Sequence, residues 1–365
     1  MTEYSVVGKP LPRVDGIAKL TGKAKYTTDI VLPDMVYAKL LRSPHPHAKI
    51  VNIDISKAEK LPGVEAVITG KDTLGIRYGF VDTPTYPGEE RPLAEEKVRF
   101  VGEAVAAIAA VDPDIAEDAL DLIEVEYDPL PAVFDPEEAM KDGAPQIHGE
   151  ITRTTSSAWE DWGVARKSHS YTPVNNVAGT VLLSYGDIEK GFSEADHIRE
   201  DRFWSPATAH MAMEPHGIVA SYDPFTGKLD VWLNHMAYEL KRYWLHKTLG
   251  IPIQKIRVHQ TYIGGAFGGK AVIFDFEVIA GFLSRKLGKP VKIELSREEV
   301  FSSCRNSIRF DTTVKTGVKK DGTIVAQHVK VIVDAGAYKG SAAVAMFMSH
   351  QFSEPCFNRR NVTHE

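Results

Sequence analysis

The stretch Gly264-Gly265-Ala266-Phe267-Gly268-Gly269-Lys270 carries the strongest structural and chemical signal in the sequence. It follows a strand-like run at 255–258 and precedes a helical pattern that ends at Gly288. Four glycines in six positions permit backbone with positive φ and let a ligand approach the main-chain amides closely. We expect a helix to begin directly after this turn and to offer its free N–H groups to an anion or an oxo group.

The turn has two other interpretations, as a phosphate-binding loop and as a purely structural turn. The residues from Gly264 to Lys270 fit most of the phosphate-binding loop pattern, but Ala271 stands where that pattern has the Ser or Thr that binds Mg²⁺. In a purely structural interpretation, the glycines only allow close packing of the backbone. The missing hydroxyl group argues against the phosphate loop, and the structural interpretation stays open.

The part of the chain before residue 140 alternates between strand and helix patterns. Strand-like runs lie at 36–41, 66–68, 105–111 and 123–127. The run at 105–111 is apolar throughout, which is typical of a strand buried on both faces. Asp112 is a suitable N-cap for the helix that follows, and Pro113 favours the first helical position. These patterns predict an α+β domain.

Residues 135–177 are polar and rich in Pro, Gly and Ser, which indicates a long connection. Beyond them, the turn Asp223-Pro224-Phe225-Thr226-Gly227 predicts a hairpin between the strand-like runs that flank it. A helix near 237–249 is expected to end at Gly250. The length therefore divides into about two domains, each large enough for its own core.

The composition is that of a folded, soluble protein. The chain has 365 residues, of which 43% are hydrophobic and 25% charged, and these values exclude a disordered chain, collagen and a coiled coil. The net charge of −6 gives no basic surface for nucleic acid or an anionic membrane. We find neither an apolar stretch long enough for a membrane span nor the pattern of a signal peptide. Cys304 and Cys356 are too few for an iron–sulfur cluster, and a reducing, cytoplasmic setting is expected.

Taken together, the motifs resemble the molybdenum-binding subunit of the xanthine dehydrogenase/aldehyde oxidase family of molybdenum hydroxylases. The glycine-rich turn is similar to that family's molybdopterin-contacting loop. Further similar stretches follow in the family's order at 13–16, 19–26, 42–48, 101–106, 127–131 and 213–216. The resemblance implies an α+β fold with an a/b hammerhead domain at 1–140, a connecting segment at 141–175 and the first, incomplete part of the molybdopterin-binding domain at 176–365.

The resemblance also assigns roles to the turn. It implies oxidation of a small molecule with water-derived oxygen at a molybdenum that the pterin holds, without a direct metal ligand from the protein. The residues expected to contact this cofactor are Gly264, Gly265, Ala266, Phe267, Gly268 and Gly269. By resemblance, the ring of Phe267 lies beside the substrate, and the amide of Gly268 faces the metal's oxo ligand.

At two positions the sequence departs from the family. The pocket glutamine that hydrogen-bonds a molybdenum ligand falls near His235 and Met236, and neither is glutamine. Either His235 takes its place through a slip of one residue, or the pocket is altered. Members that oxidise purines carry a glutamate directly after the loop lysine, whereas this chain has Ala271 in the substrate pocket. This argues against xanthine and leaves an aldehyde, another N-heterocycle or an aromatic thioester.

The third departure is at the C-terminus. The family's base, a glutamate, falls beyond residue 365, so we expect no catalytic residue in this chain. Either the chain is one part of a split molybdenum subunit or the sequence is incomplete, and in both cases the chain alone is expected to be inactive. His210, Glu214 and His216 have ligand chemistry, but a structural role is preferred because the pterin holds the molybdenum. Arg305 is expected in an ion pair, although it could also reach an anionic substrate.

Partners follow from the family and from the missing cysteines. Electrons must leave the molybdenum, so subunits that carry [2Fe–2S] clusters and FAD are implied, together with a second molybdenum-binding subunit if the chain is split. In bacterial members the pterin is often the cytosine dinucleotide form, which is an expectation from the family. The alternatives are a reductive enzyme that resembles 4-hydroxybenzoyl-CoA reductase, and a non-catalytic assembly subunit that retains the fold.

Overall fold

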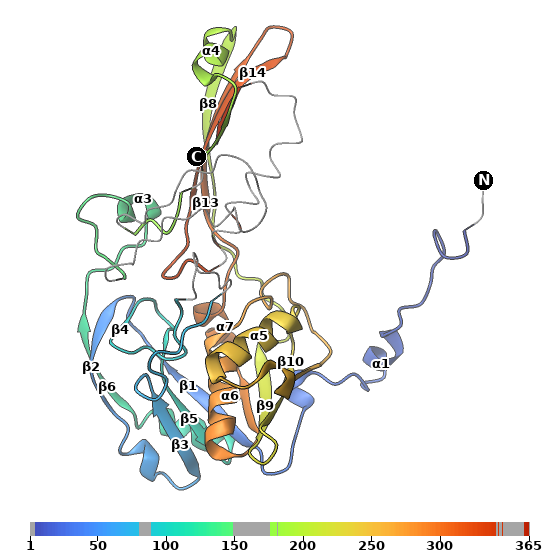
Figure 1. Ribbon diagram of the computed structural model, residues 1–365, viewed down its shortest axis with the longest axis vertical. Coiled ribbons are helices and arrows are strands. Elements are labelled where there is room, and N and C mark those ends of the chain that lie inside the picture. The colour runs from blue at the N-terminus through green and yellow to red at the C-terminus, as the bar shows by residue number, and fades with distance from the viewer. Residues whose placement is uncertain are drawn as a thin grey trace.

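A seven-stranded sheet forms the centre of the molecule, which we describe from a computed structural model (Figure 1). The structure describes residues 4–79, 89–148, 176–180, 182–340, 342, 345 and 361–364. The order of the strands in this sheet is β11-β10-β9-β12-β1-β5-β3. Their bounds are β1 (Val36–Arg42), β3 (Val64–Thr69), β5 (Ala104–Ala110), β9 (Gly217–Asp223), β10 (Lys228–Leu233), β11 (Ile256–Gln260) and β12 (Val291–Glu294).

The two parts of the chain on either side of the long connection share this sheet. β1 pairs in parallel with β12, with Val36 opposite Val291, and pairs antiparallel with β5. The main hydrophobic core therefore combines Leu40 and Ile68 from the first part with Ile218 from the second. Although each part is large enough for its own core, the two parts share this main core because β1 joins β12. The boundaries at 140 and 175 remain predictions.

Helices α5 (Tyr238–Leu249) and α6 (Asp275–Leu287) lie together beside the sheet (Figure 1). α6 packs on β9 and β12, and α5 packs on α6 and β11. Each helix ends at a glycine in the left-handed conformation, Gly250 with φ 65° and Gly288 with φ 67°, as predicted. The predicted hairpin is also present, because β9 and β10 pair antiparallel with Asp223 opposite Lys228.

The first part of the chain adds a small three-stranded sheet in the order β4-β2-β6. Its strands are β2 (Ala48–Asp54), β4 (Lys97–Val98) and β6 (Glu124–Pro129). Helix α2 (Pro113–Leu120) begins where the sequence predicts, since the side chain of Asp112 accepts a hydrogen bond from the Asp114 amide at 2.8 Å. β5 is buried along its whole length, which confirms the strand that was predicted to be covered on both faces.

A five-stranded sheet forms a ribbon that projects from the body of the molecule (Figure 1). Its order is β7-β15-β14-β13-β8, with β7 (Leu183–Tyr185), β8 (His197–Ser205), β13 (Phe310–Val318), β14 (Ile324–Val333) and β15 (Val362–His364). The remaining elements are α1 (Gly16–Leu20), η1 (Thr27–Asp29), η2 (Ala58–Lys60), α3 (Pro136–Ala139), α4 (Ile188–Ser193), η3 (Ile253–Lys255) and α7 (Arg297–Ser303). These elements confirm the predicted α+β class. Across the described ranges, no helix is both long and apolar enough to cross a membrane.

Candidate functional site

The glycine-rich loop, residues 264–270, connects β11 to α6, but α6 does not begin directly after it. The helix begins at Asp275, and the amide of Phe274 donates to the carboxylate of Glu277 at 3.0 Å. The expectation of a free helix N-terminus next to the glycines is therefore wrong. The reason is tertiary: the carbonyl of Val272 accepts hydrogen bonds from the Lys241 ammonium and from His235 Nε2, which holds this segment outside the helix.

A second segment, residues 210–214, runs alongside the loop and explains two of its glycines. A Cβ atom on Gly264 would lie 2.6 Å from Cβ of Glu214, and a Cβ atom on Gly269 would lie 2.9 Å from Nδ1 of His210. No side chain fits at either position without a shift of the neighbour. Close packing against residues 210–214 is therefore sufficient to explain why Gly264 and Gly269 are glycines.

The other two glycines shape an exposed turn. Gly265 and Gly268 have φ of 105° and 87°, and Phe267 between them has φ of 53°, which is unusual for a bulky residue. The Phe267 side chain is 73% exposed. A Cβ atom on Gly268 would have only His210 Nε2 near it, at 3.8 Å. Strain of this kind concentrates at functional sites, so this turn is the best candidate for ligand contact.

Four backbone amides of this turn have no hydrogen-bond partner among the described residues. Gly264 N and Gly269 N donate within the protein, to the Glu214 carboxylate and to the Ala266 carbonyl. Within the described part of the chain, the amides from Gly265 to Gly268 have no hydrogen-bond partner. Four successive free N–H groups beside an exposed aromatic ring form a site for an electron-rich, flat ligand.

A buried ion pair between Lys270 and Glu214 holds the two ends of the loop. Lys270 is fully buried, and its ammonium group lies 3.0 Å from Oε2 of Glu214 and 2.9 Å from the Glu214 carbonyl oxygen. The same Oε2 accepts from the Gly264 amide at 2.7 Å. Burial lowers the pKa of Lys270, and the Glu214 carboxylate opposes that change. Because the ammonium group is used inside the protein, it cannot reach a phosphate, which further weakens the phosphate-loop interpretation.

His216 supports the far end of the loop as a neutral side chain. Its Nε2 lies 3.1 Å from the carbonyl oxygen of Gly269, so Nε2 is the donor. The ring packs against Phe274 and Phe276, and burial lowers its pKa to about 4. This geometry agrees with the structural role preferred from the sequence.

The two candidates for the pocket glutamine position have different surroundings. His235 is buried, and its two ring nitrogens contact the Ala237 amide at 2.8 Å and the Val272 carbonyl at 3.3 Å. Burial lowers the pKa of His235 to about 2. Met236 is 49% exposed, and its amide donates to the Lys270 carbonyl at 3.4 Å. His235 therefore has no ring nitrogen left for a ligand, whereas Met236 lies at the surface beside the loop.

The pair formed by Lys241 and Glu277 was missed in the sequence. Both side chains are buried, and the Lys241 ammonium contacts the Glu277 carboxylate and the Val272 carbonyl. Burial lowers the pKa of Lys241 to about 8, while Glu277 opposes the shift. A signal existed: Lys241 has the same helical spacing as the buried residues Trp244, Leu245 and Thr248, which places it on the inner face of α5.

Other candidates lie outside the loop or serve the fold. Ala271 is half-buried, and its amide donates to the Gly268 carbonyl at 3.3 Å. Arg305 forms an ion pair with Glu90, and Cys304 is a buried free thiol, whereas Cys356 lies outside the described residues. In the part that the structure describes, no group of three or more His, Cys, Asp or Glu side chains could hold a metal ion.

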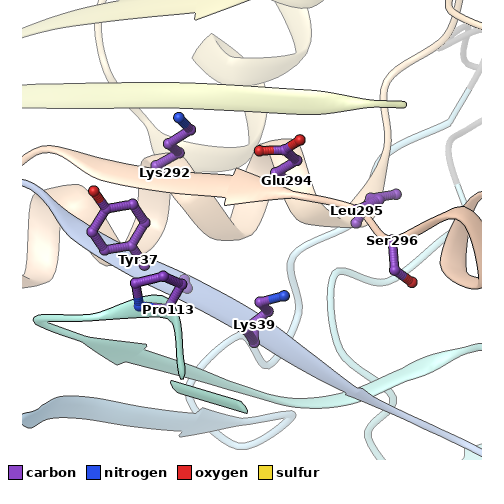
Figure 2. A pocket seen from close by; sticks show the side chains of 8 residues that line it. Tyr37, Lys39, Pro113, Lys292, Glu294, Leu295 and Ser296 are labelled. Carbon is purple, nitrogen blue, oxygen red and sulfur yellow. The ribbon is translucent and has the colours of Figure 1, made fainter. Parts of the chain in front are cut away.

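A cavity of about 290 Å³ lies over β1 and β12 and is separate from the loop (Figure 2). Its lining residues are Tyr37, Ala38, Lys39, Pro113, Lys292, Glu294, Leu295 and Ser296. No residue of the loop or of segment 210–214 is among them. The cavity therefore does not belong to the candidate site.

Two family models and several known proteins are similar to this chain. Residues 168–365 match the family model of the molybdopterin cofactor-binding domain, and residues 21–131 match that of the aldehyde oxidase and xanthine dehydrogenase a/b hammerhead domain. A probable xanthine dehydrogenase subunit of Bacillus subtilis (strain 168) is 36% identical, over 94% of this chain and 43% of the relative. The nicotinate dehydrogenase large molybdopterin subunit of Eubacterium barkeri is 35% identical, over 92% of this chain and 72% of the relative.

Solved structures are also similar to this chain over nearly its whole length. Quinoline 2-oxidoreductase from Pseudomonas putida 86 superposes with a TM-score of 0.81 and 29% identity, over 98% of this chain and 43% of the neighbour. The aldehyde oxidoreductase from Desulfovibrio gigas has a TM-score of 0.85 and 25% identity, over 97% and 37% of the two chains. The chain thus spans less than half the length of most of these relatives.

Proposed function

The chain belongs to the molybdopterin-binding subunits of the xanthine dehydrogenase and aldehyde oxidase family, and we propose that its exposed loop forms part of a site where a small organic molecule is oxidised with water-derived oxygen. The observation that carries this proposal is the exposed turn at Phe267 and Gly268, with its four free amides. When bound, the molybdenum cofactor supplies two-electron oxidation chemistry. The residues of the loop bind and orient the reactants.

The loop fits such a group in three ways. The amides from Gly265 to Gly268, which have no partner among the described residues, would donate hydrogen bonds to electron-rich atoms of the cofactor. The open space beside Gly268 lets a ligand approach the backbone. The exposed ring of Phe267 forms an apolar wall for a flat substrate. Two backbone bonds hold this surface in place: the Gly264 amide donates to the Glu214 carboxylate, and the Gly269 amide donates to the Ala266 carbonyl.

The substrate is proposed to be an aldehyde, an N-heterocycle other than xanthine, or an aromatic thioester. Ala271 follows the loop directly, and its methyl group offers no hydrogen bond to a purine ring. Met236 is the exposed residue near the position of the pocket glutamine, and a thioether is a weak acceptor that donates no hydrogen bond. Both residues favour recognition by shape and apolar contact over recognition by polar groups.

We further propose that subunits with [2Fe–2S] clusters and FAD accept the electrons in a cytoplasmic complex, and that the pterin is the cytosine dinucleotide form. The two cysteines of the chain support separate iron–sulfur carriers. We propose no catalytic base among residues 1–365 and, as a further partner, a second molybdenum-binding subunit. The relatives differ in length: 343 residues cover 72% of the nicotinate dehydrogenase subunit, whereas 349 residues cover only 43% of the Bacillus subtilis relative.

A non-catalytic assembly subunit is the second candidate. The observation that favours it is Met236, because a site without the glutamine lacks one hydrogen bond to the metal's ligands. If the site is catalytic, the complex holds molybdenum at this chain. If the chain is an assembly subunit, it does not.

The test compares two glycines with nearly the same positive φ. Gly268 has φ of 87° at the loop, and Gly322 has φ of 85° in the turn between β13 and β14, with nothing within 4 Å of a Cβ atom. Gly268→Ala and Gly322→Ala therefore introduce similar strain, but only the first blocks the proposed ligand surface. The complex is purified through a tag on this chain, and molybdenum and pterin are measured per chain.

We expect Gly268→Ala to lower the content of both molybdenum and pterin about tenfold, and Gly322→Ala to leave both unchanged. Equal contents in the two variants would contradict a cofactor contact at the loop. A wild-type complex without molybdenum would favour the assembly subunit.

A further inference from the structure

We infer that His210 faces the ligand of the loop, with Nδ1 donating to the protein backbone and with Nε2 accepting a hydrogen bond from the bound molecule. The inference deepens the proposed function and rests on it. From the sequence, a structural role was preferred over metal binding for His210, Glu214 and His216. In the structure these three residues differ in which of their side-chain polar atoms have a hydrogen-bond partner.

The tautomer follows from the contact of Nδ1. This atom lies 3.1 Å from the carbonyl oxygen of Arg305. A carbonyl oxygen only accepts, so Nδ1 must carry the proton, and in the neutral ring Nε2 is left with a free lone pair. An imidazole held in this way presents a fixed acceptor atom on its far side.

Backbone pairing fixes the contact between His210 and Arg305. Thr208, two residues before His210, forms an antiparallel β-bridge with Ser307, two residues after Arg305. The Ser307 amide donates to the Thr208 carbonyl at 2.9 Å, and the Thr208 amide donates to the Ser307 carbonyl at 3.3 Å. The Arg305 side chain is held by its ion pair with Glu90. The orientation of the imidazole is therefore imposed by two paired segments and does not depend on a ligand.

The free nitrogen lies on the exposed side of the loop. The closest atom to a Cβ atom on Gly268 is His210 Nε2, at 3.8 Å, whereas a Cβ atom on Gly269 would lie 2.9 Å from Nδ1 and Cγ. The ring thus lies along the backbone with Nδ1 toward Gly269 and Nε2 toward Gly268. Among the described residues, Nε2 has no hydrogen-bond partner, and the side chain is only half-buried.

The neighbouring polar side chains cannot take this role. Glu214 Oε2 is used by Lys270 and Gly264, and its Oε1 is buried without a partner. His216 donates to the Gly269 carbonyl, and its Nδ1 is also buried. His210 is the member of this group whose free atom is reachable from the Gly268 side. The matching ligand atom is an N–H or O–H donor, such as those of a pterin ring.

Two substitutions separate the nitrogens of the ring. Asparagine places an amide near the position of Nδ1 and can keep the bond to the Arg305 carbonyl, whereas glutamine places its polar end near the position of Nε2. The holo complex is prepared with His210→Asn and with His210→Gln. Retained pterin and molybdenum are measured after prolonged dialysis, and the melting temperature of each complex is measured in parallel.

We expect His210→Asn to keep the melting temperature within about 2 °C of wild type and to retain about fivefold less pterin, the factor that corresponds to one lost hydrogen bond. His210→Gln is expected to retain clearly more pterin than His210→Asn. Wild-type retention in His210→Asn would overturn the inference, and so would parallel losses of stability and pterin in both variants, because the ring would then serve packing alone. Absence of pterin from the wild-type complex would instead refute the proposed function.

Discussion

The substitution Lys270→Met tests whether the buried ion pair holds the glycine-rich loop in place. Methionine keeps most of the length of the side chain but removes the ammonium group that lies 3.0 Å from Glu214 Oε2. The Glu214 side chain is 8% exposed, so water cannot replace the lost partner. The carboxylate would keep a single hydrogen bond, from the Gly264 amide.

The expected loss follows from this burial. Removal of one partner of a buried ion pair typically costs about 3–5 kcal/mol, because the other charge remains uncompensated. Lys270 also donates to the Glu214 carbonyl, so we expect the free energy of unfolding to fall by about 4 kcal/mol. Adding Glu214→Gln removes the stranded charge, so the double variant should lose about 1–3 kcal/mol less than the sum of the two single losses.

The measurement is urea-induced unfolding of the purified protein at pH 7.5, with linear extrapolation to water. Lys57→Met is the matched control, because Lys57 pairs with Glu124 while the two side chains are 62% and 66% exposed. This control should lose less than about 1 kcal/mol. If Lys270→Met lost no more than Lys57→Met, the reasoning from burial would be refuted.

Two further predictions concern a helix cap and the dependence on pH. Asp112→Ala removes the bond to the Asp114 amide at the start of α2 and should cost about 1 kcal/mol in urea unfolding, whereas Asp118→Ala on the same helix should cost little; equal losses would contradict the cap. Burial lowers the pKa of His216 to about 4, below its ordinary value near 6.5, so its stabilising effect is complete above pH 6.5 and is lost as the pH falls through 4. Between pH 7.5 and 5.0, wild type should therefore lose about 2 kcal/mol more than His216→Phe, and parallel pH profiles would disprove this.

Much of the fold could be predicted because local chemistry determines where elements begin and end. Asp112 and Pro113 mark the start of α2, and Gly250 and Gly288 mark the ends of α5 and α6. Each of these residues acts on its own turn of the chain. The pairing of β1 with β12 had no such signal, because two short strands far apart in the sequence carry nothing that specifies each other as partners.

The sequence indicates where the glycine-rich loop lies, but it does not reveal what each glycine of the loop does. The four glycines located the loop, but the reasons for them differ: Gly264 and Gly269 accommodate segment 210–214, whereas Gly265 and Gly268 have positive φ. The delayed start of α6 depends on the buried Lys241, which satisfies a carbonyl from another element. Contacts of this kind arise only after the elements have packed together.

The parallel pairing of β1 with β12 also has a consequence for synthesis on the ribosome. The β1 edge that joins β12 stays open until roughly 250 further residues have been added. At about 5–20 residues per second, this takes roughly 10–50 s. During that time an apolar edge strand can pair with a neighbouring nascent chain, which is how aggregation begins. The early part of this polypeptide is therefore a natural client for a chaperone that holds unfinished chains apart.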